Sequence, residues 1–185
     1  ESSIARVRQA LAKDGFDTAL WRGLAEQGAL AIRVPEEAGG LGLGIFDAAL
    51  LMEEAGRTLV SGPLAEAIVA ARLLAQLDPQ NASGLRDAVA SGASVLTLAL
   101  HDVAAQGVQL VAGGAVAEAV IARDGDAIVL VRPSVHVAER TLASTPIGRL
   151  DLAGGERTIL GKGNDALAFY GAALEEWKLL IAAAL

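Results

Sequence analysis

The sequence predicts an α+β protein, and three observations carry that prediction. Up to residue 93, apolar residues recur three and four positions apart, which is the spacing of helices. From residue 94, short apolar runs alternate with turn residues, which is typical of strands in an antiparallel sheet or small barrel. From residue 163 the helical spacing returns. We therefore expect an N-terminal all-α domain at 1–93, a small antiparallel sheet or barrel domain at 94–162, and at 163–185 a helix that opens a third domain.

Five helices are expected in the first domain. Asp17 is placed to cap the second helix, and Gly28 suits the left-handed position just after it. On the third helix, Glu53 and Arg57 are spaced for an i,i+4 ion pair. The helices are expected at about residues 4–13, 17–28, 45–59, 61–78 and 83–90.

The second domain is expected to contain short strands joined by turns. The segment at residues 123–126, Arg-Asp-Gly-Asp, is a strong signal for a hairpin turn. The helix after this domain is expected to be capped by Asn164 or Asp165. Its apolar end, residues 179–185, needs to be buried by the rest of a bundle or by another chain. Strand-like runs occur at residues 94–100, 108–111, 119–122, 127–131 and 134–138, and around 146–147 and 157–159.

Composition excludes several kinds of site. The chain has 185 residues, of which 53% are hydrophobic and only 3% aromatic, so Ala, Leu and Val must build most of the core. The absence of cysteine excludes disulfides, thiolate zinc sites and cysteine nucleophiles. The two histidines, His101 and His136, are too few for a histidine-based metal centre, and no metal site is predicted.

Charge and hydropathy limit the partners. A formal net charge of −7 argues against nucleic acid, whose recognition needs clustered Lys and Arg. No apolar run approaches the roughly 18 residues that a membrane span requires. The first fifteen residues lack the apolar region of a signal peptide. We therefore expect a cytoplasmic protein that binds neither nucleic acid nor membranes.

The stretch VPEEAGGLGLGIF, residues 34–46, raises the question of a nucleotide-binding loop. A dinucleotide fingerprint needs the spacing G-x-G-x-x-G after a buried strand, whereas the spacing from Gly40 is G-x-G-x-G. Pro35 and the two glutamates after it suit neither a buried strand nor a phosphate. No Lys-Ser or Lys-Thr pair follows, so a P-loop is excluded as well. The glycines are therefore expected to form a tight connection before the third helix.

The same stretch lies within a longer segment that resembles a known family. Residues 21–64 resemble the N-terminal helical domain of the flavin-dependent acyl-CoA dehydrogenases. The resemblance implies that the domain at 94–162 is a small antiparallel β-barrel and that 163–185 is the first helix of a C-terminal helical bundle that is otherwise missing. The family pattern is roughly W-x-x-L-x-E-x-G, then P-E-E-x-G-G-x-G, then an E-E-x-G-R helix and a G-P step. This sequence supplies Trp21, Leu24, Glu26 and Gly28, then Pro35, Glu36, Glu37, Gly39, Gly40 and Gly42, then Glu53, Glu54, Gly56 and Arg57, and finally Gly62 and Pro63.

The resemblance implies an FAD-dependent α,β-dehydrogenation of an acyl-CoA thioester to a trans-2-enoyl-CoA. Electron-transfer flavoprotein is the partner that it implies, and the oxidation of fatty acids or steroid side chains is the setting. A family strand beside the flavin usually ends A-L-T-E-P-x-A-G-S-D, and the equivalent here is LALHDVAAQG. Leu100, His101 and Asp102 are therefore expected to contact the cofactor. For His101 the alternative is a strand-end histidine held by hydrogen bonds.

The sequence also departs from the family where chemistry is expected. Residues 110–122 lack the lysine and the aromatic residue that usually follow the flavin-contacting strand. Some family members carry the glutamate base on the first bundle helix, but Trp177 stands at that position here. Glu176 is one residue earlier on the helix and therefore points about 100° away from the substrate side, so it is expected to be a solvated carboxylate. No catalytic residue is predicted in this chain.

Three readings of the chain follow from the resemblance. It is either a protomer of an ordinary homo-oligomeric acyl-CoA dehydrogenase, or a degenerate partner subunit of a heteromeric one that lacks its own catalytic base. The alternative from another class is a non-catalytic assembly module that keeps the acyl-CoA dehydrogenase fold. The acyl chain that is bound cannot be read from the sequence.

Overall fold

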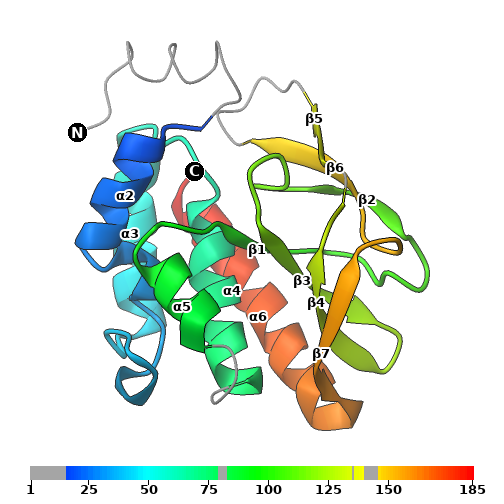
Figure 1. Ribbon diagram of the computed structural model, residues 1–185. Coiled ribbons are helices and arrows are strands. Elements are labelled where there is room, and N and C mark those ends of the chain that lie inside the picture. Colours follow the sequence, from blue (N-terminus) through cyan, green and yellow to red (C-terminus); the bar gives the residue numbers. More distant parts are fainter. Residues whose placement is uncertain (1–15, 79–82, 135, 140–145) are drawn as a thin grey trace.

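A computed structural model describes residues 16–78, 83–134, 136–139 and 146–185 of the chain. The helices gather on one side of the molecule and the strands on the other, with α4 and α6 nearest the strands (Figure 1). The α+β class is thus confirmed. The first expected helix, at 4–13, lies outside the described residues. The helices are α2 Thr18–Glu26, α3 Ile45–Arg57, α4 Leu64–Leu77, α5 Ser83–Ala90 and α6 Gly163–Ala183, with the single 3-10 turns η1 Ala29–Ala31 and η2 Glu36–Ala38.

The strands form two sheets rather than one. The four-stranded sheet has the order β1-β3-β4-β7, and the three-stranded sheet has the order β2-β6-β5. All pairs are antiparallel, as expected, except for β1 with β3. That pair is parallel because the chain leaves the first sheet after β1, runs through β2 in the second sheet, and returns. The strands are β1 Leu96–Leu98, β2 Val108–Val111, β3 Ala119–Asp124, β4 Ala127–Arg132, β5 His136–Glu139, β6 Ile147–Asp151 and β7 Glu156–Lys162.

Local signals in the sequence define several of these boundaries. The amide of Leu20 donates a 2.9 Å hydrogen bond to Oδ1 of Asp17, which confirms the cap of α2. Gly28 follows α2 with φ 77°, in the left-handed region that was expected. The hairpin between β3 and β4 turns at Gly125, with φ 63° and Asp124 paired with Ala127.

Two local expectations are wrong. Neither Asn164 nor Asp165 caps α6, because the chain enters this helix directly from β7 and Lys162 takes the cap position without a side-chain bond. Asp165 lies instead in the first turn, where a negative charge is still favourable. Arg57 pairs with Glu54 rather than Glu53, since a spacing of three places side chains on one face as well as a spacing of four does.

The principal hydrophobic core is shared by the helices, one face of the four-stranded sheet and α6. Helix α4 lies at its centre and is buried around most of its circumference, as an almost wholly apolar helix must be. Leu96, Ile121 and Ile128 join this core from the sheet, and Leu180 joins it from α6. The core therefore extends across both expected domain boundaries, at 93/94 and 162/163. A second, smaller core lies between the two sheets and includes Val129 and Leu150.

The apolar end of α6 is only partly covered. Leu180 is fully buried, whereas Leu179 is 47% exposed. The last turn packs closely on α3, because Gly56 offers no Cβ to collide with the carbonyl group of Ala184. Within the described parts of the chain, no helix is both long and apolar enough to cross a bilayer.

Candidate functional site

The four glycines of the glycine-rich stretch bond through their own amide groups and leave none of these four for a phosphate. Each of its four glycines donates its N–H to an acceptor within residues 34–47. This confirms that the stretch is a tight connection before α3 and not a nucleotide loop. The bonds run from Gly39 to the Glu36 carbonyl (2.9 Å), from Gly40 to Pro35 (3.1 Å), from Gly42 to Val34 (2.8 Å) and from Gly44 to Oδ2 of Asp47 (2.9 Å).

The loop after β1 carries the residues expected to contact a cofactor. The side chains of Leu100 and His101 are exposed, while the backbone between them is fixed by a buried glutamine of β2. Gln109 is 1% exposed, and its Nε2 donates to the carbonyls of His101 (3.0 Å) and Gln106 (2.8 Å). Its Oε1 accepts from the amide of His101 (3.3 Å). No sequence motif singles out Gln109, and its role was missed.

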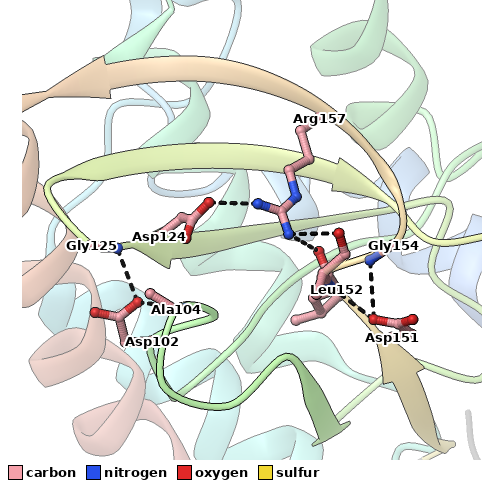
Figure 2. Close-up of polar contacts among 9 residues, drawn as sticks. Asp102, Ala104, Asp124, Gly125, Asp151, Leu152, Gly154 and Arg157 are labelled. Carbon is pink, nitrogen blue, oxygen red and sulfur yellow. Dashed lines mark hydrogen bonds and ion pairs between the residues drawn. The ribbon is translucent and has the colours of Figure 1, made fainter.

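Asp102 holds this loop against the hairpin between β3 and β4 (Figure 2). Its Oδ1 accepts from the amides of Gly125 and Ala104, each at 3.0 Å, and its Oδ2 lies 3.3 Å from Nε of Arg123. The hydrogen bond from Gly125 is the main cause that lowers the pKa of Asp102 below its usual value. Both carboxylate oxygens are therefore engaged within the chain.

A tyrosine from α6 fixes the start of the same loop. The hydroxyl of Tyr170 donates to the carbonyl of Ala99, the residue immediately before Leu100. Tyr170 is buried, and this burial raises its pKa to about 12. Together, Tyr170, Gln109 and Asp102 hold in place the loop from which the side chains of Leu100 and His101 project.

A second group of polar contacts in Figure 2 is structural. Nη1 of Arg157 donates to Oδ2 of Asp124 (2.6 Å), and its Nη2 donates to the carbonyls of Leu152 (3.0 Å) and Ala153 (2.8 Å). Oδ1 of Asp151 accepts from the amides of Ala153 and Gly154, each at 3.0 Å. These bonds tie β7 to β3 and close the turn after β6. Their groups are satisfied by one another.

The carboxylate of Glu176 on α6 is buried between two arginines. Nε of Arg33 donates to Oε1 (2.8 Å), and Nη1 of Arg72 from α4 donates to Oε2. Glu176 is only 9% exposed, so the expectation of a solvated carboxylate is wrong. The physical reason is its position on the helix: residue 176 faces α4 and the segment after η1, and both supply a guanidinium group.

The next residue of α6 engages a second buried acid. Nε1 of Trp177 donates a 2.9 Å hydrogen bond to Oε1 of Glu66, in the first turn of α4. Glu66 is 5% exposed, and among the described residues no cation pairs with it. Burial raises the pKa of Glu66, and the bonds from Trp177 and from its own amide only partly offset this. Of these two adjacent residues of α6, Glu176 is thus an acid paired with two cations. Trp177 bonds to Glu66, an acid that no cation pairs with among the described residues.

Glu66 lines a cavity of about 210 Å³ between α3, the start of α4 and the end of α6. The other residues of this cavity are apolar or glycine, and they include Met52, Leu59, Leu64 and Ile181. No sequence pattern distinguishes Glu66 from any other acid at the start of a helix. Across the part of the chain that the structure describes, no group of three potential metal-ligating side chains occurs.

Comparison with known proteins agrees with this architecture. Residues 1–78 match the family described as acyl-CoA dehydrogenase, N-terminal domain. Acyl-CoA dehydrogenase IpdE2 of Mycobacterium tuberculosis is 45% identical over 97 residues, which are 50% of this chain and 30% of that protein. The chain is an acyl-CoA dehydrogenase homologue. It spans less than a third of the length of this curated relative.

Solved structures of acyl-CoA dehydrogenases share the fold over nearly the whole chain. A variant of the Tcur3481-Tcur3483 steroid ACAD superposes with a TM-score of 0.79 at 27% identity, covering 98% of this chain and 57% of that chain. The ChsE4-ChsE5 complex from Mycobacterium tuberculosis superposes with a TM-score of 0.71 at 26% identity, covering 90% of this chain and 54% of that chain. The homologue thus has the helical and β-layers of these enzymes in the same arrangement.

The loop after β1 fits the edge of a flavin only in part. The exposed side chains of Leu100 and His101 can supply an apolar contact and one imidazole hydrogen bond to the ring. The carboxylate of Asp102 is already engaged by the amides of Gly125 and Ala104 and by Arg123. Asp102 therefore suits a positioning role within this loop.

Proposed function

We propose that this chain is a partner subunit of a heteromeric acyl-CoA dehydrogenase and that it supplies no catalytic base from α6. The observation that carries the proposal is the pairing of Glu176 with Arg33 and Arg72. The assembly catalyses the FAD-dependent α,β-dehydrogenation of an acyl-CoA thioester to a trans-2-enoyl-CoA and passes electrons to electron-transfer flavoprotein.

The reaction needs a carboxylate that can take up the α-proton of the thioester. Both oxygens of Glu176 already accept hydrogen bonds from partly buried guanidinium groups of this chain, Oε1 from Arg33 and Oε2 from Arg72, so the carboxylate is not available to a thioester. Trp177, at the position where some family members carry the base, has an indole N–H that can only donate. The proposal therefore takes the base from the other subunit.

Two observations on related structures support the heteromeric arrangement. The two solved structures described above are named as pairs of proteins, Tcur3481-Tcur3483 and ChsE4-ChsE5. The name of the first also describes a steroid ACAD, which makes steroid-derived and fatty acyl-CoA thioesters the substrate classes to test. The cytoplasmic location stays a prediction.

FAD, when bound, supplies the acceptor for the β-hydride. In this proposal the side chains of Leu100 and His101 contact its ring, and Asp102 holds the loop in place. The contacts of Leu100 and His101 with the cofactor remain predictions, and Asp102, which the sequence predicted as a third contact, is assigned to positioning the loop. The amides of His101 and Ala104 are already bonded to Gln109 and Asp102 and are therefore not free for the cofactor.

The test is turnover by the purified native complex containing the full polypeptide, with Glu176→Gln compared with wild type. We expect flavin absorbance in the complex and a kcat per bound flavin within about twofold for the variant, because Glu176 does not touch the substrate. A decrease of about 10²–10⁴-fold in kcat, with the flavin still bound, would identify Glu176 as the base and overturn the proposal.

The same experiment addresses the alternative of an assembly module. A native complex that carries no flavin and shows no turnover with any acyl-CoA would favour that reading. For the comparison of Glu176→Gln with wild type, the matched control is Glu175→Gln on the exposed face of α6, which makes the same chemical change one residue away.

A further inference from the structure

The cavity between α3, α4 and α6 has an unusual lining. Of the described residues around it, only Glu66 has an ionisable or hydrogen-bonding side chain, while Met52, Leu59 and Ile181 make it apolar. A buried carboxyl group without a hydrogen-bonding partner is costly, so its contacts matter. Its one side-chain partner is the indole of Trp177, which donates to Oε1.

The protonation state of Glu66 follows from these surroundings. Glu176 is also buried, but two guanidinium groups compensate its charge. Glu66 has only hydrogen bonds from neutral groups and no ion-pair partner among the described residues. Burial disfavours the carboxylate more strongly than the start of α4 can favour it. These surroundings favour the neutral carboxylic acid form of Glu66, in which Oε1 accepts from Trp177 and an O–H is available as a donor.

We infer that this cavity binds the oxygen-bearing end of an alicyclic or branched aliphatic acyl group, and that Glu66 donates a hydrogen bond to its ketone or hydroxyl oxygen. The inference rests on the proposed function for the acyl nature of the ligand. A purely hydrocarbon group would leave the acid unpaired, so Glu66 selects for the oxygen.

The size of the cavity supports this choice of occupant. Its volume of about 210 Å³ is below the roughly 300–1,000 Å³ typical of sites that enclose a whole ligand. It suits one ring or a short branched segment, with the remainder of the ligand outside. A further segment of polypeptide would need to bring an acceptor for Glu66, and this outcome is included in the test.

Met52 provides a local probe for ligand binding. It lines the cavity and is the single methionine of the 185 residues. The full polypeptide, in its native complex, is labelled with ¹³C-methyl methionine, and Met52→Leu assigns the resonance. Cyclohexanone and methylenecyclohexane, which differ in C=O against C=CH₂, are titrated separately.

We expect cyclohexanone to shift the Met52 resonance saturably, with a Kd at least about fivefold lower than that of methylenecyclohexane. In Glu66→Leu the two Kd values become equal, and in Glu66→Gln, whose amide still donates, the preference remains. Glu53→Leu, on the exposed face of α3, is the control and keeps the wild-type preference.

Two outcomes overturn the inference. Equal Kd values in the wild type would mean that Glu66 contributes no selectivity, and that comparison does not depend on any variant. An unchanged Met52 resonance with both probes would mean that polypeptide already fills the cavity. Neither probe contains CoA and neither readout involves turnover, so failure here leaves the dehydrogenase proposal to its own test.

Discussion

Oε1 of Glu176 lies 2.8 Å from Nε of Arg33, although the two residues are 143 positions apart in the sequence. Arg72 completes the cluster, so that α4, α6 and the segment after η1 meet at one carboxylate. The arginines also border a recess that contains Glu36 and Glu37. Glu176 thus fixes α6 to the helical layer by charge, in addition to the apolar contact made by Leu180.

Replacing Glu176 by Met is expected to destabilise the protein by about 3 kcal/mol, because it leaves two partly buried guanidinium groups unpaired. The measurement is the free energy of unfolding in urea. Replacing all three members of the cluster by Met is expected to recover most of that loss, since no unpaired charge remains.

Glu175→Met is the control for this prediction. Its carboxylate pairs with Lys178 on the exposed face of α6, where an ion pair contributes about 0.5 kcal/mol. A loss for Glu176→Met as small as that for Glu175→Met would contradict the cluster as a stabilising element.

Much of the fold follows from local patterns in the sequence. The spacing of apolar residues located α3 and α5, and Asp17, Gly28 and the turn at Gly125 were each placed by one residue's chemistry. The glycine-rich connection was recognised because its spacing failed every phosphate-loop pattern. These features depend on residues close together in the chain.

The features that were missed depend on distant residues. Glu176 reads as a surface carboxylate on its own helix, because Arg33 and Arg72 lie 143 and 104 positions away. The parallel pairing of β1 with β3 was missed for the same reason, since it depends on β2 joining a different sheet. Periodicity indicates which face of an element is apolar but not which element covers it.

Gln109→Ala is expected to loosen the loop that carries Leu100 and His101. The change removes three hydrogen bonds and leaves partly buried backbone groups without these partners, at a cost of about 1–3 kcal/mol. Amide hydrogen exchange in residues 100–107 should become faster. In Gln106→Ala, which removes an exposed 3.3 Å bond, exchange should stay near the wild-type rate. Equal effects of the two changes would argue against Gln109 as the clamp.

Gly56→Ala is expected to separate the last turn of α6 from α3. The added Cβ would overlap the carbonyl of Ala184, and relieving the clash should cost about 1–3 kcal/mol. Thermal unfolding measures the change. At Gly171, within α6, an added methyl group meets no other atom, so Gly171→Ala should stabilise the protein by up to about 1 kcal/mol. Stabilisation by both changes would exclude close packing at Gly56.

Glu66→Gln is expected to stabilise the protein at neutral pH but not in acid. Burial raises the pKa of Glu66 above its usual 4.5, so between 4.5 and the raised value the folded state holds a proton that the unfolded state has lost. Stability of the wild type therefore falls as pH rises through that window and is constant above it. Glutamine does not titrate and still accepts from Trp177.

The difference in unfolding free energy between Glu66→Gln and wild type should accordingly grow from near zero below pH 4.5 to a plateau. Urea denaturation at a series of pH values measures it. Glu53→Gln, an exposed change on α3, should give a nearly pH-independent difference. A wild type that gains stability relative to Glu66→Gln as pH rises would mean that Glu66 is ionised in the folded protein. In that case a cation must pair with it, and the carboxyl could not act as the donor in the cavity.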